Sequence, residues 1–191
     1  AAFGLNSTTA TNSSVAVGSD GTTAANSSFA AGFTSKAGTS SSSSYGHNIA
    51  VGSNTKADNG SSAFGINATA NNQSLAIGLN GNSSSSASAT NQSIAIGNNA
   101  QAGSDGQYAA VALGNGATAP YAQTTAIGSG AKVTSPYGTA LGSGTSAAYY
   151  ATALGYSASA TSQYTTAVGD GAGAHGTSAT ALGNGAAANA D

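Results

Sequence analysis

A three-residue word, Ala followed by one further residue and then Gly, recurs along this chain of 191 residues at intervals close to fourteen. Thirteen copies keep one phase, from Ala2-Phe3-Gly4 to Ala181-Leu182-Gly183, and nine of the twelve intervals between them are 13 or 14 residues. Random low-complexity sequence does not keep such a phase, so the period predicts stacked structural units. The repeat glycines are Gly4, Gly18, Gly32, Gly52, Gly65, Gly78, Gly97, Gly114, Gly128, Gly142, Gly155, Gly169 and Gly183.

Each repeat has room for two short strands and two turns. The residues one and three places before the Gly are often apolar, as in Val15 and Val17 or Ile94 and Ile96. Side chains alternate along a strand, so this pair shares one face and the invariant Ala points the other way. A solvent-facing position would accept Ser, Thr or Lys. We therefore predict a strand buried on both faces, one against its own coil and one against a partner chain, and hence a homo-oligomer.

The second strand of each repeat follows the Gly. Small residues stand three and five places after it, as in Ala68 and Ala70, and mostly polar residues stand four places after it. The polar register contains all three lysines of the chain, Lys36, Lys56 and Lys132, and it also contains Thr22. This strand is predicted to have one inner and one outer face.

Three intervals exceed fourteen residues, and their extra residues are polar. We interpret these stretches, near 38–46, 82–92 and 103–107, as loop insertions in an otherwise regular stack. The whole chain, 1–191, is predicted to be a single repeat domain.

Charge is scarce in this sequence: three Lys and five Asp give a net charge of −2, with no Arg, Glu or Cys. This balance gives no electrostatic footprint for nucleic acid or anionic lipid. The two histidines are far apart and the aspartates occupy unrelated registers, so no catalytic constellation appears. We expect no enzyme activity, metal site or cofactor, and no direct membrane contact.

The repeats resemble the head repeats of YadA-like trimeric autotransporter adhesins. The match is carried by stretches such as Ser14-Val15-Ala16-Val17-Gly18, Asn48-Ile49-Ala50-Val51-Gly52 and Ser93-Ile94-Ala95-Ile96-Gly97. The resemblance implies an all-β, left-handed parallel β-roll of 13–14-residue coils that assembles as a homotrimer on the bacterial cell surface. It also implies a stalk and an outer-membrane anchor that follow the head, so we expect this chain to be the head of a longer protein.

Tyrosine is the one unevenly placed residue type. Six tyrosines fall five to seven residues before their Gly and are predicted to line one edge of the stack: Tyr108, Tyr121, Tyr137, Tyr149, Tyr150 and Tyr164. They are interpreted either as stacking that stiffens a turn or as a contact surface for protein or glycan ligands. The three lysines are interpreted as solvated surface charges or as contacts for acidic ligands.

The function that the resemblance implies is attachment to host matrix or cells, to other bacteria or to abiotic surfaces. Two alternatives remain open at this point. One is a free-standing β-solenoid that binds ice or another ordered surface, because Thr replaces the apolar residue three places before the Gly from Thr125 onward. That Thr column falls on the face predicted to be buried. The other is a passive spacer that projects another domain.

Overall fold

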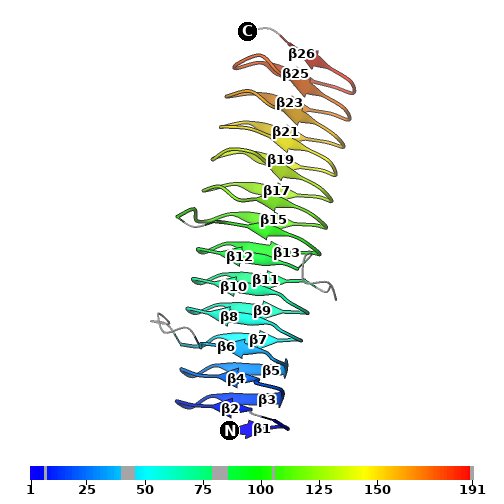
Figure 1. The fold of residues 1–191 in the computed structure, drawn as a ribbon. Coiled ribbons are helices and arrows are strands. Elements are labelled where there is room, and N and C mark those ends of the chain that lie inside the picture. Colours follow the sequence, from blue (N-terminus) through cyan, green and yellow to red (C-terminus); the bar gives the residue numbers. More distant parts are fainter. Residues whose placement is uncertain (7, 40–45, 79–85, 105, 190–191) are drawn as a thin grey trace. The chain divides into compact units, whose positions relative to one another are not determined.

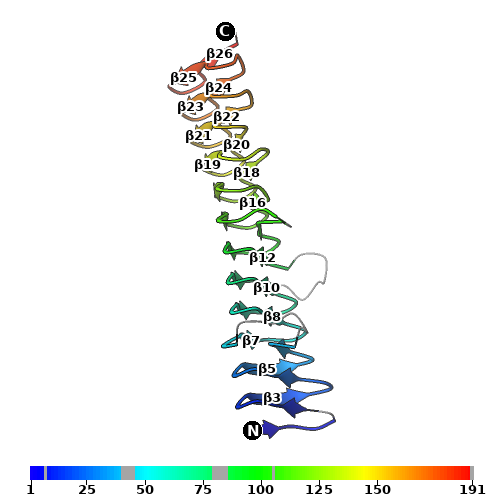
Figure 2. The ribbon, with the colours of Figure 1, turned by 90° about the vertical axis from the view of Figure 1, so that its left-hand side faces the viewer.

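The computed structural model describes residues 1–6, 8–39, 46–78, 86–104 and 106–189. These residues form two compact units, Ala1–Asn99 and Ala100–Asp191. Within the described ranges the regular structure is entirely β, and each unit is a stack of coils that contribute one strand to each of two sheets, sheet A and sheet B (Figure 1). The view in Figure 2, turned by 90°, shows the same stacking in each unit.

In the first unit, sheet A consists of β1 (Ala2–Phe3), β3 (Val15–Ser19), β5 (Phe29–Phe33), β7 (Ile49–Val51), β9 (Ser62–Phe64), β11 (Leu75–Ile77) and β13 (Ile94–Ile96). Its sheet B consists of β2 (Thr9–Ala10), β4 (Thr23–Ala24), β6 (Lys36–Ala37), β8 (Lys56–Asp58), β10 (Thr69–Asn71) and β12 (Ser88–Thr90).

In the second unit, sheet A consists of β15 (Val111–Leu113), β17 (Thr125–Ile127), β19 (Thr139–Leu141), β21 (Thr152–Leu154), β23 (Thr166–Val168) and β25 (Thr180–Leu182). Its sheet B consists of β14 (Gln101–Ala102), β16 (Thr118–Ala119), β18 (Lys132–Val133), β20 (Ser146–Ala147), β22 (Ser159–Ala160), β24 (Gly173–Ala174) and β26 (Ala187–Ala188).

The strands pair in parallel with the same strand of the next coil, in the register that the repeat predicts. Ala76 in β11, for example, lies opposite Ala63 in β9 and Ala95 in β13. One repeat therefore corresponds to one coil, and the prediction of a parallel β-roll with 13–14-residue coils is confirmed. That residues 1–191 form a single domain stays a prediction.

The interior of each coil is filled almost entirely by alanine. The repeat Ala of sheet A is buried in every coil after the first, and Ala2 in β1 is exposed. From sheet B the small residues predicted to face inward, such as Ala68 and Ala70, meet them at 0% exposure. Because neither sheet carries a large side chain on its inner face, with Val133 as an exception, the two sheets lie close together.

Serine hydroxyls form a further interior column, four places before the Gly, which the repeat word does not reveal. The Ser61 Oγ accepts the backbone N–H of Ser74 at 3.1 Å, and the Ser74 Oγ accepts that of Ser93 at 3.2 Å. These buried amides sit in turns, where strand pairing does not reach them. The column therefore supplies partners that the buried turn would otherwise lack.

Two expectations from the sequence are wrong, one about register and one about a loop insertion. The spacing assigns Thr22 to the outer polar register, but this residue is fully buried and donates to the carbonyl of Gly32. The turn after Gly18 contains one extra residue, Gly21, so Thr23 takes the outer position opposite Lys36. Conformational freedom at Gly21, whose φ is +84°, lets the turn absorb that residue.

The second wrong expectation is that residues 88–90 belong to a loop insertion. They form β12, which pairs with β10, and the alternating small residues keep Ala87 and Ala89 fully buried. In the third insertion Ser104 and Gln107 form an antiparallel bridge. Residues 40–45, 82–85 and 105 of these insertions lie outside the described residues.

Candidate functional site

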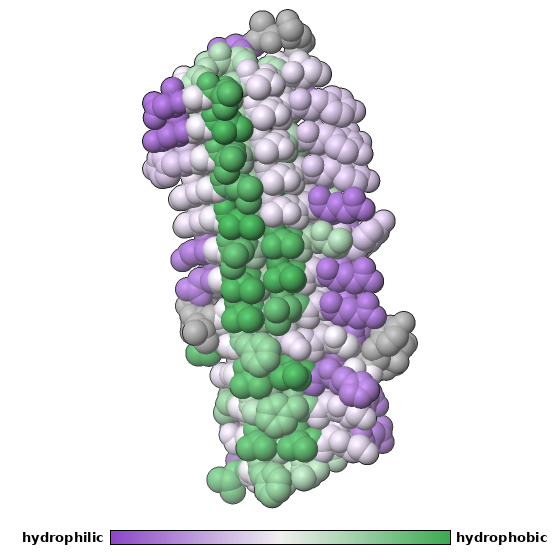
Figure 3. Space-filling view, turned by 180° about the vertical axis from the view of Figure 1, so that it is seen from behind, coloured by the Kyte–Doolittle hydropathy of each residue, from purple (hydrophilic) through white to green (hydrophobic). Residues whose placement is uncertain are grey.

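The outer face of sheet A carries the apolar residues of the repeat. Side chains one and three places before the Gly point away from the coil and are half-buried or exposed, as at Val17, Ile49, Ile94 and Leu113. Figure 3 shows apolar residues gathered in columns on the surface of each unit. The predicted burial of this strand on both faces thus holds only for the Ala face within a single chain. The opposite face of the strand, which carries the large apolar side chains, is not covered by other parts of the described chain.

In the second unit the outer face of sheet A combines an apolar column with a threonine column. Thr125 and Thr139 are half-buried, and Thr152 and Thr180 are exposed. The Thr column is expected on a buried face, and within one chain it lies on the surface instead. Threonine replaces the larger side chain three places before the Gly. The position one place before the Gly stays apolar, as at Ile127, Leu141 and Leu154.

Four of the six singled-out tyrosines form one cluster at a turn of the second unit. The rings of Tyr137 and Tyr150 stack with centroids 4.6 Å apart, and those of Tyr150 and Tyr164 stack at 5.6 Å. Tyr149 meets all three edge-on, at 4.7 to 6.2 Å. The predicted ladder is therefore present over these coils, and Tyr137, Tyr150 and Tyr164 remain exposed at the surface.

The other two tyrosines do not join the cluster within the described residues. Tyr108 is exposed and Tyr121 is half-buried, and the ring contacts are confined to the four tyrosines above. Inside the cluster, partial removal of the Tyr150 hydroxyl from water raises its pKa above the ordinary value of 10.0. Repulsion from the negative charge that develops on Tyr149, Tyr137 and Tyr164 raises that pKa further.

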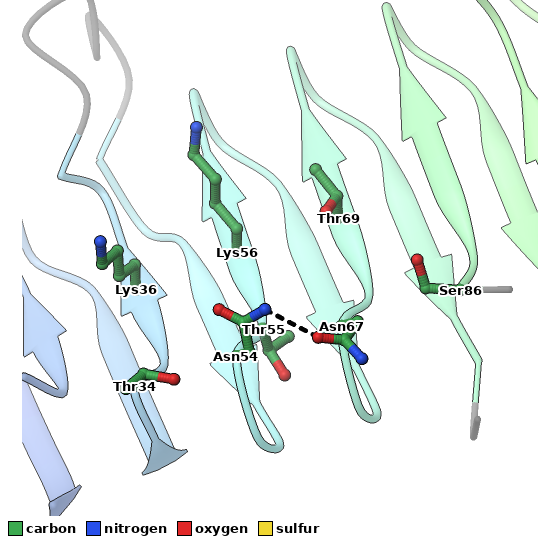
Figure 4. Close-up of a pocket in the computed structure, with 8 residues that line it drawn as sticks. All are labelled: Thr34, Lys36, Asn54, Thr55, Lys56, Asn67, Thr69 and Ser86. Atoms are coloured by element: carbon green, nitrogen blue, oxygen red, sulfur yellow. Dashed lines mark hydrogen bonds between the residues drawn. The ribbon is translucent and has the colours of Figure 1, made fainter. Parts of the chain in front are cut away.

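The three lysines project from the outer face of sheet B, as predicted. Lys36 and Lys56 occupy adjacent strands in register, whereas Lys132 has Thr118 and Ser146 as its neighbours in register. A depression of about 320 Å³ surrounds the first two lysines (Figure 4). Its other lining residues, which the repeat pattern does not single out, are Thr34, Asn54, Thr55, Asn67, Thr69 and Ser86.

Among the described residues, no group of three or more His, Asp, Cys or Glu side chains is placed to hold a metal ion. No helix of the described ranges is long and apolar enough to cross a membrane. His175 accepts or donates one hydrogen bond with the Thr161 hydroxyl at 2.8 Å, on the surface of the second unit.

The repeat is similar to that of a known protein family. The model of the YadA head domain repeat matches residues 1–20, 122–145 and 147–172, which include segments of both units. Over these segments the chain is similar to YadA head domain repeats. No curated protein sequence matches it. The matched segments contain six copies of the Ala-x-Gly word, which end at Gly4, Gly18, Gly128, Gly142, Gly155 and Gly169.

The similarity to YadA head repeats agrees with the structure of the coil. The same word that carries the family match supplies the buried Ala and the outward apolar residue of sheet A in both units. The surfaces that each coil offers to other molecules are the outer faces of its two sheets and the turns between them.

Proposed function

We propose that this chain is the adhesive head of a trimeric surface adhesin of a bacterium, exposed at the cell surface and attached to the outer membrane through other parts of the protein. The proposal is supported by the match to YadA head repeats and by the single observation that gives it physical content, the uncovered apolar face of sheet A. Its ligands would be host matrix or cell-surface molecules, other bacteria or solid surfaces.

The uncovered apolar face favours assembly with copies of the same chain. The interior of one coil is built from alanine, so a single chain buries little apolar area for each residue that it orders. Packing the columns of Ile, Leu, Val and Phe from sheet A against those of other protomers removes them from water. A continuous apolar surface of this kind on a soluble protein marks an interaction site. The number three comes from the family.

Such a trimer leaves sheet B and the turns free to make contacts. The inner faces of the two sheets face each other, so the outer face of sheet B points away from the apolar face of sheet A. Three identical flanks for each head, and many heads for each cell, raise the strength of attachment without a deep pocket. Adhesion by many weak contacts is therefore the mechanism that we propose.

The first experiment measures the mass of the purified chain by light scattering after size exclusion. We expect a β-rich species of three times 17.8 kDa. Beads coated with that trimer should then adhere to matrix-coated and cell-coated surfaces, and beads coated with a non-adhesive protein of the same size should not. A folded monomer contradicts the trimer, and a trimer whose beads adhere to none of these surfaces contradicts the adhesive role.

One observation favours a second candidate. The Thr column of the second unit lies outside the coil on a regular parallel sheet, as in a solenoid that binds ice or another ordered surface. A monomer that shows thermal hysteresis would support this alternative. In the proposed trimer the same column is covered by other protomers, so a trimer with hysteresis is not expected. A head that binds nothing and whose deletion leaves adhesion intact would instead be a spacer.

A further inference from the structure

The depression on sheet B of the first unit places two like charges side by side. Lys36 in β6 and Lys56 in β8 lie opposite each other in a parallel pair, and both side chains point to the same side (Figure 4). Adjacent strands are about 4.8 Å apart. Like charges on directly opposite residues of adjacent strands repel each other. The neighbouring coils place hydroxyl residues, Thr23 and Thr69, at the same register and avoid this repulsion.

The two ammonium groups differ in how much of their charge is balanced. Lys56 Nζ lies 3.5 Å from Oδ2 of Asp58, whose side chain is only 2% exposed. Asp58 also accepts the backbone N–H of Thr39 at 3.0 Å, so the buried carboxylate is held in place and orients Lys56. The Lys56 side chain is still 54% exposed, and an ammonium has three donors. Lys36 is exposed, and Lys56–Asp58 is the ion pair found among the described residues. The pair of lysines therefore has donors left for an external anion.

The rest of the depression is lined by hydroxyl and amide groups. Asn54 and Asn67 stand on successive turns, and the Asn54 amide donates to Oδ1 of Asn67 at 2.7 Å. Thr34, Thr69 and Ser86 complete the rim, and Thr55, which donates to the Gly65 carbonyl, lies at the floor. No apolar side chain is among the described lining residues. An acyl chain or an apolar peptide side chain would find no complementary surface here, whereas sugar hydroxyls would find donors and acceptors.

We infer that this depression, the Lys36–Lys56 site, binds an acidic saccharide, that is, a sugar unit carrying a sulfate or a carboxylate. The acidic group is bridged by the two ammonium groups, which relieves their mutual repulsion, and the ring hydroxyls meet Asn54, Asn67 and Thr69. The site lies on sheet B, opposite the face proposed to form the trimer, so each head presents three copies. The inference rests on the adhesive role proposed above and names the chemistry of one ligand class.

Direct binding tests the site without relying on adhesion. The purified trimeric head is titrated by calorimetry with sulfated maltotetraose and with tetragalacturonate, which carry sulfate and carboxylate respectively. Maltotetraose is the neutral control and sodium sulfate the bare-ion control. We expect at least one acidic tetrasaccharide to bind at least tenfold more tightly than maltotetraose, with weaker binding at higher salt. Loss of a charge-assisted hydrogen bond weakens binding by about tenfold, so K36Q/K56Q should lose nearly all of it.

The chain offers a matched control for this variant. Lys132 occupies the same outer register on β18 but has no second lysine beside it, so K132Q should bind within about twofold of the unchanged head. K36T/K56T is a second double variant, because Thr is what neighbouring coils carry at this register. Circular dichroism and light scattering confirm that each variant remains a folded trimer.

Three results would overturn the inference: K36Q/K56Q binds as tightly as the unchanged head, K132Q weakens binding as much as the double variant, or sodium sulfate competes at the same concentration as the saccharide. Adhesion to matrix that has been enzymatically stripped of acidic glycans separates this inference from the proposed function. Adhesion there with no saccharide binding sinks the Lys36–Lys56 site alone, and loss of adhesion to all surfaces sinks the adhesive role.

Discussion

Replacing Gly128 with Ala should destabilise the second unit far more than the same change two residues later, at Gly130. The backbone of Gly128 has φ +133°, and a Cβ on it would lie 2.4 Å from the carbonyl oxygen of Gly142 in the next coil. Gly130 has φ +66°, where alanine is strained only moderately, and a Cβ there meets nothing within 4 Å. The two positions share one turn, so they differ mainly in the approach of the next coil.

The cost at Gly128 has two parts. Alanine at that φ adds about 1–3 kcal/mol of backbone strain. A Cβ contact below 3.0 Å with backbone cannot persist, so the next coil must move by several tenths of an ångström. That movement strains the inter-coil bonds from Gly142 N–H to Ile127 and from Gly144 N–H to Ser129, 2.8 and 2.9 Å long, each with a net value of about 1 kcal/mol. The free energy of unfolding should fall by about 2–5 kcal/mol, compared with about 1 kcal/mol for Gly130→Ala.

Urea unfolding followed by circular dichroism measures both variants at one protomer concentration, because assembly contributes to stability. Repeat arrays can unfold in parts, so the slope of each transition is compared as well as its midpoint. Gly183→Ala isolates the strain, since Gly183 has φ +121° with nothing within 4 Å of its Cβ. Equal losses at Gly128 and Gly130 would refute the reasoning that the stacked carbonyl fixes the repeat glycine.

Three further predictions concern the faces and the interior of the coil. Ile127→Asp should convert the proposed trimer to a monomer by light scattering, because a carboxylate would be buried in each contact, while Thr118→Asp on sheet B should leave the mass unchanged. Tyr150 should ionise above pH 10.0 in an ultraviolet absorbance titration, and Tyr149→Phe should lower its pKa by removing a neighbouring charge. Because the folded-state pKa is raised, the stability due to Tyr150 is complete below about pH 10 and is lost as the pH rises through that raised pKa. Ala126→Val should lower the urea midpoint by the equivalent of about 1–3 kcal/mol, because the alanine interior has no space for two more methyl groups.

The repeat makes the fold predictable because one coil constrains the next. A parallel pair places equal positions of successive repeats side by side, so the word Ala-x-Gly is enough to define the register, the coil length and the alternation of the two faces. The direction of the large apolar residues does not follow in the same way. Alternation shows that Ala and its neighbours face opposite sides, but either side could be the interior. The interior is the Ala side because only small side chains fit between two closely spaced sheets.

The tyrosine cluster shows how finely position decides contact in such a stack. Tyr137, Tyr150 and Tyr164 all stand five residues before their Gly and all have a positive φ, between +50° and +62°. Their rings therefore project from one turn position and stack. Tyr149 stands six places before its Gly and still joins the cluster, whereas Tyr108, at the same interval, and Tyr121, at seven, do not. An interval of five to seven residues is therefore too broad to predict which rings touch. The spacing of the repeat does not specify the local turn geometry, and that geometry decides the contact.

The same logic distinguishes positions that can carry function from those that cannot. Interior columns must hold Ala, Gly or a small hydroxyl residue in nearly every coil, because each is covered by the coils above and below it. Outer columns meet solvent, so a change in one coil disturbs its neighbours little. The binding site inferred above depends on unusual residues that occupy one outer column in consecutive coils, because only then do their side chains lie within a single strand spacing. Lys36 and Lys56 satisfy this condition and Lys132 does not. The two kinds of lysine therefore provide a test, within one chain, of whether adjacency or charge alone creates the site.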